Sequence, residues 1–407
     1  MTRPRRPDDP GLADEAVRWV GAYVHIPFCR RVCPYCDFAV VSLERSRASG
    51  DEPTEVPSGG ENGDRRAPYL SALLAEIVRD EPFDRPLDSI FVGGGTPTSL
   101  NPADLEKVVA ALRDRFGLAP DAEVSLEANP EDVTPAVGGA LARAGFNRIS
   151  LGVQSFDSGV LAALGRQHGP DEASAAIRVA LDAFPSVNVD LIFGTPGETL
   201  PSWKSTVDRA LDSGIQHLSA YALTVERGTP LGRSVSAGAP APDPDDQAGK
   251  YEHVAATAGA AGLVRYETSN FARPGHHCRY NLLTWAQGEY AAFGNGAHRH
   301  RNGVRSWNVR RVDRYVERGA TDPRSGEERI EGWAREVERV SLGLRRAAGV
   351  TPGRAGTALL ATPDGRRLVA AGVIAAADGR VVVTRPMLGD EVARSLLAVG
   401  EPSPAPG

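Results

Sequence analysis

The chain has 407 residues, of which 41% are hydrophobic, and it carries a formal net charge of −6 at neutral pH. This length suggests about two domains, and no apolar run approaches the ~20 residues of a membrane span. The negative net charge gives no support for a nucleic-acid partner.

The beginning of the chain is expected to be a flexible tail over residues 1–21, because its basic start is followed by no apolar stretch of the kind a secretory leader needs. Cysteine is scarce, with 4 residues in the whole chain. That scarcity favours a reducing, cytoplasmic location.

Three cysteines follow the first predicted strand, Ala22–Pro27, in a C-x3-C-x2-C pattern: Cys29, Cys33 and Cys36. Three thiolates can hold three irons of a cubic [4Fe–4S] cluster, for which four protein ligands are usual. The fourth iron is then free for a small molecule. S-adenosylmethionine (SAM) is the natural candidate, since its amino and carboxylate groups can chelate one iron. The alternative is a structural zinc site completed by His25 or Cys278.

Alternating strands and helices are predicted after residues 42–67, a polar stretch expected to be a disordered insertion. The short apolar strands are typical of a parallel sheet buried on both faces. Six βα units are fewer than the eight of a closed barrel, so the sequence predicts an α/β fold with a partial, open (β/α)6 barrel over residues 22–310. The further strands are expected at Ser89–Val92, Glu123–Glu127, Arg148–Val153, Val187–Phe193 and His217–Leu223. The helices are expected near Pro68–Arg79, Pro102–Phe116, Pro135–Ala144, Glu172–Ala183 and Pro201–Ser213.

The last third of the chain divides into two parts. Residues 265–308 are rich in aromatic residues and glycine without a clear period, and they are expected to cover the mouth of the barrel. Residues 311–400 are expected to form a C-terminal α+β, winged-helix-like accessory domain, because helical stretches near Ala334–Arg346 and Arg366–Ala371 precede a hairpin signal around Ala377–Gly379.

Polar motifs stand where the predicted strands end, which is where chemistry gathers in parallel α/β proteins. The glycines of Gly93–Thr96 let a ligand approach the backbone closely. Glu127 can bind a ribose hydroxyl or an ammonium, although an ion pair at a helix start is the alternative. Gln154 can donate and accept hydrogen bonds, and Arg166 can clamp a carboxylate. Asp190 lies within an apolar strand and needs a ligand or a charged partner there.

As a set, the motifs YVHIPFCRRVCPYC, GGGTPTSL, SLEANP, GVQSF, LGRQH, DLIFGTPGET and YALTVERGTPL resemble the radical-SAM family of oxygen-independent coproporphyrinogen III oxidases and their relatives. The resemblance covers roughly residues 22–398. It implies a [4Fe–4S] cluster on Cys29, Cys33 and Cys36. It also implies SAM contacts at Tyr23, Tyr35, Gly94, Gly95, Thr96, Glu127, Gln154, Arg166, Asp190 and Ala222.

The family has two branches that differ two residues after the third cysteine. The oxidases look like they carry a further cysteine there, whereas this chain has Phe38 and resembles the haem-chaperone branch, the HemW proteins. That resemblance implies binding of haem and its delivery to haem proteins of the respiratory chain, together with an electron donor and a homodimer. The alternative is the oxidase reaction itself, the radical decarboxylation of coproporphyrinogen III.

A motif of the chaperone branch, H-N-x-x-Y-W, is similar to residues 280–285, but Tyr280 replaces its histidine and Thr284 its tyrosine. Histidine, cysteine and tyrosine are all known haem ligands, and tryptophan can stack on a porphyrin. The haem candidates are therefore His276, His277, Cys278, Tyr280, Asn281 and Trp285, with His298 and His300 as weaker ones. Solvated loop histidines, a free buried thiol and a core tryptophan are the alternatives.

Overall fold

The computed structural model describes residues 10–44 and 65–402. Residues 1–9 of the expected tail and residues 45–64 of the expected insertion lie outside the described residues. Within the described part, Pro10–Ala16 forms helix α1 and strand β1 already begins at Val20. Residues 10–21 therefore contain regular structure where a tail was expected.

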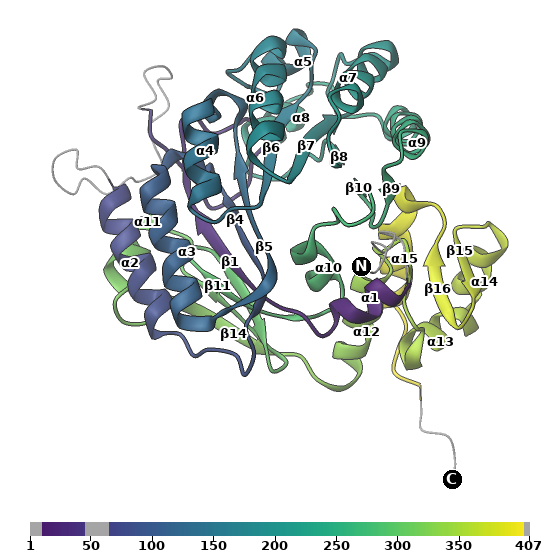
Figure 1. Ribbon diagram of the computed structural model, residues 1–407. Coiled ribbons are helices and arrows are strands. Elements are labelled where there is room, and N and C mark those ends of the chain that lie inside the picture. Colours follow the sequence, from purple (N-terminus) through teal and green to yellow (C-terminus); the bar gives the residue numbers. More distant parts are fainter. Residues whose placement is uncertain (1–9, 45–64, 403–407) are drawn as a thin grey trace.

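Six parallel strands form the centre of the molecule, and helices cover the convex face of this curved sheet (Figure 1). Neighbours pair in parallel in the order β1-β4-β5-β6-β7-β8, and the sheet keeps two separate edges. The predicted α/β class and the open (β/α)6 arrangement are thus confirmed. The strands are β1 (Val20–Ile26), β4 (Leu87–Gly94), β5 (Leu118–Ala128), β6 (Arg148–Gln154), β7 (Ser186–Phe193) and β8 (His217–Ala222).

Several of these helices begin at capping signals that the sequence supplies. At the start of α3, the Asn101 side chain accepts a hydrogen bond from the backbone of Asp104, and Pro102 occupies the first turn. Thr134 and Thr199 cap α4 and α7 in the same way. The helices of this layer are α2 (Arg66–Arg79), α3 (Pro102–Phe116), α4 (Pro135–Arg143), α5 (Ser158–Ala163), α6 (Pro170–Ala183), α7 (Leu200–Asp212) and α9 (Pro244–Ala260). Helix α8 (Pro230–Ser236) lies beside the cysteine loop, where the N–H of Leu231 bonds to the carbonyl of Pro34.

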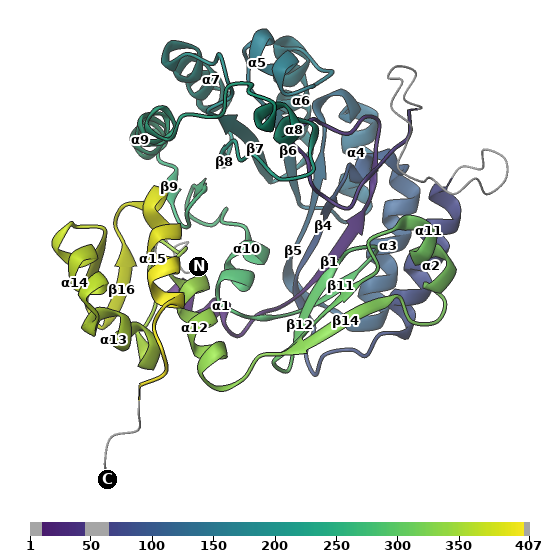
Figure 2. The same cartoon turned by 180° about the vertical axis from the view of Figure 1, so that it is seen from behind.

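The segment expected over the mouth, residues 265–308, is regular and extends the sheet at both edges. Antiparallel β10 (Asn270–Ala272) and β9 (Val264–Arg265) continue the sheet beyond β8. Parallel β11 (Glu289–Phe293) joins β1, followed by antiparallel β12 (His298–Arg301), β13 (Val304–Asn308) and β14 (Arg324–Arg329). Between the two edges, α10 (Arg279–Trp285) lies on the concave side of the sheet beside α1 (Figure 2).

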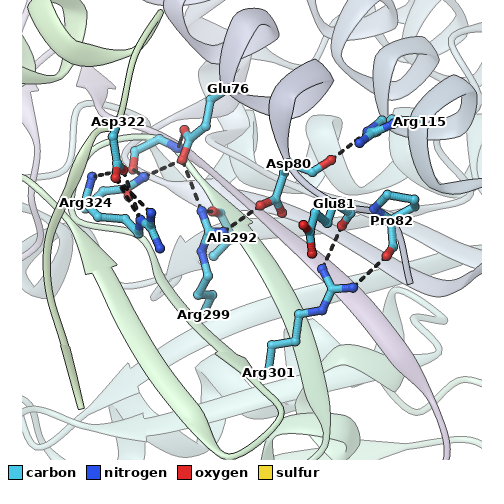
Figure 3. A network of polar contacts seen from close by, with 12 residues as sticks. Glu76, Asp80, Glu81, Pro82, Arg115, Ala292, Arg299, Arg301, Asp322 and Arg324 are labelled. Carbon is cyan, nitrogen blue, oxygen red and sulfur yellow. Dashed lines mark hydrogen bonds and ion pairs between the residues drawn. The ribbon is translucent and has the colours of Figure 1, made fainter. Parts of the chain in front are cut away.

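A buried carboxyl fixes the β11–β14 extension to α2 (Figure 3). Glu76 accepts hydrogen bonds from the side chains of Asn308 at 2.7 Å and Tyr315 at 2.5 Å, and it pairs with Arg299 at 3.4 Å. Arg299 also pairs with Asp80 at 2.8 Å. Burial raises the pKa of Glu76 while these donors lower it. Each buried oxygen thereby has a partner, which a buried carboxyl requires.

The C-terminal unit has a hydrophobic core of its own, which begins at Trp333. The preceding α11 (Val312–Arg318) packs on α2, and β14 pairs with β13, so residues 311–331 belong with the barrel layer instead of the unit expected from residue 311. The unit consists of α12 (Gly332–Gly343), α13 (Gly353–Ala361), α14 (Pro363–Ala370), β15 (Ile374–Ala377), β16 (Arg380–Val383) and α15 (Gly389–Leu397). Among the described residues, no helix combines the length and apolar character needed to cross a bilayer.

Candidate functional site

A cavity of about 440 Å³ opens at the carboxyl ends of the parallel strands, and three thiols line it. Cys29, Cys33 and Cys36 follow β1, are half-buried and form no disulfide. Burial raises the pKa of Cys29 to about 11, and it also raises the pKa of Cys36. Cys29 and Cys36 therefore keep their protons when no metal is bound, and iron must displace those protons on binding.

The glycine loop after β4 is fastened to the cysteine loop through its backbone. Gly94 has φ of +107° and donates its N–H to Glu127 at 3.0 Å. The N–H groups of Gly95 and Thr96 bond to the carbonyls of Ile26 and Phe28, each at 2.8 Å. All three amides are thus occupied, so a ligand at this loop meets carbonyl oxygens, which accept hydrogen bonds from an ammonium group.

Two half-buried carboxyls, Glu127 and Asp190, face the cavity from β5 and β7. Burial, and secondly the charge of Asp190, raises the pKa of Glu127 from 4.5 to about 7. Asp190 accepts hydrogen bonds from Ser150 at 2.7 Å and from Asn188 at 2.8 Å, while burial raises its pKa. Asp190 thus has polar partners within the sheet, as its place in an apolar strand requires. Two carboxyls in one cavity favour a cation or a hydroxyl donor as ligand.

Strand β6 and the loop after α5 supply a neutral and a cationic group. Gln154 has φ of +67°, a backbone conformation that a non-glycine residue adopts at a cost and often at functional sites. Arg166 donates to the Gly152 carbonyl at 2.9 Å, and its Nε is buried with no partner among the described residues. A buried guanidinium N–H of this kind suits an incoming carboxylate.

The structure brings nearly all of the predicted SAM contacts to this one cavity. The exception is Tyr23 on β1, whose ring stacks on both Phe91 and Tyr280 and whose hydroxyl bonds to His25 at 3.0 Å. The predicted residues that line the cavity are Tyr35, Gly94, Gly95, Thr96, Glu127, Gln154, Arg166, Asp190 and Ala222.

Asn129 and Tyr221 are two of the lining residues that were not predicted. Asn129 bonds to both Thr96 and Arg166, and its place in the motif SLEANP, two residues after Glu127, was the available signal. Tyr221 is 41% exposed and also borders a second cavity of about 330 Å³ beside the C-terminal unit. Tyr221 directly precedes the predicted Ala222 on β8, but nothing in the sequence distinguishes it from a core tyrosine.

The haem candidates that follow β10 lie at the opposite end of the sheet, and no haem candidate lines the cavity that the three cysteines line. Arg148, the first residue of β6, donates to the carbonyl of His276 at 2.8 Å, and the His276 ring contacts Ser186, the first residue of β7, at 3.3 Å. Cys278 is buried there, with its pKa raised by burial. The amino ends of the strands therefore hold this segment, away from the cysteine loop.

The other haem candidates are packed against aromatic and cationic neighbours. The His277 ring stacks on Trp19 with centroids 6.2 Å apart, and burial lowers its pKa to about 3. Tyr280 stacks on Phe91 at 5.3 Å. The guanidinium of Arg345 lies 5.0 Å from the Trp285 ring centroid. Asn281 is half-buried in the same helix, α10.

The two weaker histidine candidates lie on β12. His300 bonds to the Gly288 carbonyl at 2.9 Å, and His298 stacks on Trp307 with centroids 5.6 Å apart. Both rings thus contact the β11–β13 extension instead of the cavity.

A parallel (β/α)6 sheet with a three-cysteine loop after its first strand and a ligand cavity at the strand ends defines a radical-SAM protein. In agreement, a family model described as the radical SAM superfamily matches residues 23–210. Superfamily membership implies a [4Fe–4S] cluster and SAM.

Curated relatives identify the family within this superfamily. The chain is 41% identical to the "Heme chaperone HemW" of Mycobacterium tuberculosis, over 95% of this chain and 97% of the relative. It is 34% identical to that of Bacillus subtilis, over 82% and 85%, and 38% identical to that of Escherichia coli, over 68% of each. The chain therefore belongs to the HemW family of the radical SAM superfamily.

A solved structure supports the fold alone. The Escherichia coli protein described as "Coproporphyrinogen III oxidase (HemN)" superposes with a TM-score of 0.74 over 95% of this chain and 93% of its own, at 21% sequence identity. At that identity the likeness extends to the arrangement of strands and helices.

Proposed function

We propose that this chain is a cytoplasmic haem chaperone that holds a [4Fe–4S] cluster on Cys29, Cys33 and Cys36 and SAM in the adjoining cavity. It passes haem to haem proteins, among them those of the respiratory chain. The observation that carries the proposal is the 41% identity, over nearly the whole length of both chains, to a relative named as a haem chaperone.

The lining of the cavity supports the two cofactors. The three half-buried thiols surround one end, and a cubic cluster takes its thiolates one for each iron. The free N–H of Arg166 suits the SAM carboxylate, and the carbonyls of the glycine loop suit its ammonium. When bound, the cluster would supply an electron and SAM would accept it.

Phe38 supports carriage of haem over oxidation of a porphyrinogen. Its ring lines the cavity and is 63% exposed, and an aromatic hydrocarbon cannot ligate a metal. The remaining cysteine of the chain, Cys278, is buried at the other end of the sheet. The residues around the cluster therefore offer three thiols where the oxidase pattern has a fourth nearby.

We further propose that haem is bound by the segment that contains His276, His277, Cys278, Tyr280, Asn281 and Trp285. Of the four ligand candidates among these, His276 is buried least deeply, so its ring needs the smallest rearrangement to reach an iron. A homodimer and an electron donor complete the scheme.

The test combines haem binding with turnover. The protein is reconstituted anaerobically with iron and sulfide, titrated with haem while the Soret band is followed, and then mixed with a haem-free acceptor protein. Saturable binding and transfer of haem are expected. The same protein, given SAM, a reductant and coproporphyrinogen III, should form no protoporphyrinogen, while the Escherichia coli oxidase run in parallel confirms the conditions.

Variants locate the haem. His276→Ala and His277→Ala should weaken haem binding or shift the Soret band, whereas His253→Ala, a control on α9 remote from this segment, should change neither. Absence of saturable binding, or protoporphyrinogen formed over many turnovers, would overturn the proposal. Wild-type binding by both variants would reject these ligands and leave Cys278 and Tyr280 to be tested.

A further inference from the structure

A continuous series of hydrogen bonds joins two of the three cluster cysteines. The Thr96 hydroxyl donates to Sγ of Cys29 at 3.7 Å, and the amide of Asn129 donates to the Thr96 oxygen at 3.1 Å. The Asn129 oxygen accepts from Arg166 at 2.5 Å, and a second nitrogen of Arg166 donates to Sγ of Cys33 at 3.7 Å. Four different segments of the chain, which end at one edge of the sheet, supply these residues.

The chemistry of Arg166 fixes the direction of every hydrogen bond in the series. A guanidinium only donates, so the oxygen of the Asn129 amide must face it, and the NH₂ group must face Thr96. The Thr96 oxygen therefore accepts, and its single hydrogen is left for the Cys29 sulfur. The donors run from Arg166 through Asn129 and Thr96 to Cys29, without a break or a reversal.

Aligned hydrogen bonds of this kind polarise one another, most strongly where water is excluded. Thr96 is 6% exposed, and Arg166 is half-buried. The positive charge of Arg166 thus strengthens the hydrogen bond that reaches Cys29. In the loaded protein this sulfur is a thiolate bound to iron, which accepts more strongly than a thiol.

Hydrogen bonds to the sulfurs are among the features that set the reduction potential of an iron–sulfur cluster. Reduction adds negative charge to the cluster, and donors to its sulfurs stabilise that charge. We infer that Thr96 and Asn129 are positioning residues that relay the charge of Arg166 to Cys29 and thereby raise the reduction potential of the cluster. The inference rests on the cluster proposed above and is independent of haem delivery.

The test is a potentiometric titration, without SAM, of anaerobically reconstituted proteins, followed by electron paramagnetic resonance of the reduced cluster. Asn129→Leu and Thr96→Val should each lower the equilibrium constant for reduction about tenfold, because each removes a charge-assisted donor. For a one-electron couple, tenfold is about 59 mV. Thr96→Ser keeps the hydroxyl and should keep the wild-type potential.

The double variant separates a relay from two local effects. Because both substitutions interrupt the same series, Asn129→Leu with Thr96→Val should lower the potential no further than one of them alone. Additive shifts would overturn the relay. Asn147→Leu is a matched control, since this amide bonds to the backbone at Val124 and Ala122, and the potential should stay unchanged.

Asn129→Asp keeps the test decisive if the leucine variant fails to load. Its carboxylate still accepts from Arg166 but cannot donate to Thr96, so the potential should fall as well. A loaded Asn129→Asp or Thr96→Val protein with the wild-type potential would refute the relay. Iron and sulfide content of the wild type tests the cluster itself, so failure of the proposed function is recognised separately.

Discussion

The carboxyl of Glu127 offers a sharp test of the electrostatics of the cavity. Burial and the neighbouring Asp190 raise its pKa from 4.5 to about 7, so the folded protein keeps this proton between about pH 4.5 and pH 7, where the unfolded chain has lost it. The contribution of this group to folding stability therefore falls as pH rises through that window. The rise corresponds to about 3 kcal/mol as an upper value, because the side chain still reaches water in the cavity.

Glu127→Gln removes this titration while it retains the shape of the side chain. Chemical denaturation of the empty wild type should show a loss of stability between about pH 4.5 and about pH 7 that the variant lacks. The loss should not exceed about 3 kcal/mol. Equal pH profiles for the two proteins would show that the carboxyl titrates normally and that the cavity does not desolvate it.

Binding of SAM should follow the opposite trend. A ligand that donates hydrogen bonds to Glu127 favours the ionised form, which makes up about a tenth of the molecules at about pH 6 and about nine tenths at about pH 8. The affinity of the wild type relative to Glu127→Gln should therefore rise about tenfold over this range. Dividing the affinity of the wild type by that of Glu127→Gln removes the effect of the titration of SAM itself. An affinity ratio that stays constant with pH would refute contact between SAM and the Glu127 carboxylate.

Three further predictions concern the cluster loop and the fold around it. Cys33→Ala should lose the iron–sulfur absorbance after reconstitution, and retention of stoichiometric iron and sulfide would contradict the ligand assignment. Gly95→Ala should lower the midpoint of thermal unfolding and the cluster content, since the added Cβ would lie 2.8 Å from backbone atoms of Ile26 and Pro27, an overlap that costs about 1–3 kcal/mol. Lys250→Met should cost about 3–5 kcal/mol in chemical denaturation, because it leaves the buried Glu198, now 3.0 Å from Lys250, without its cation. The exposed pair of Lys107 is the control, and Lys107→Met should cost less than about 1 kcal/mol.

The central sheet could be predicted because each of its strands is a short apolar run between a helix and a polar motif. The residues at which the strands begin and end were less predictable than the order of the strands along the chain. β5 was expected from Glu123 but begins at Leu118, because its first half includes Pro120 and Asp121 and is only partly buried. The apolar pattern shows a strand only where both of its faces are covered.

The cavity could be predicted because parallel strands place their carboxyl ends at one edge. Glu127, Gln154 and Asp190 are far apart in the sequence, yet each lies in the carboxyl-terminal half of such a strand and reaches the same space. Topology alone brings them together. The hydrogen bonds that Glu127 accepts from Gly94 and that Asp190 accepts from Ser150 could not be predicted, because they depend on side-chain orientation.

The segment of residues 265–308 shows where sequence reasoning fails. Its sequence shows no continuous helical or strand period. The reason is that its strands are divided between the two edges of the sheet, where β10 pairs with β8 and β11 pairs with β1. Arg148 fixes it through the carbonyl of His276, 128 residues away. A backbone acceptor has no residue type, so no pattern in the sequence identifies it.

Tyr23 belongs to the family motif, yet its role in the structure also could not be predicted from the sequence. Burial lowers the pKa of His25 to about 4, so its ring is neutral, and its Nε2 lies 3.1 Å from the Ala39 carbonyl, which can only accept. That contact places the proton on Nε2 and leaves Nδ1 to accept from the Tyr23 hydroxyl. Because Ala39 follows Cys36 closely, Tyr23 holds the far end of the cysteine loop through His25, a role that its place in the motif alone does not reveal.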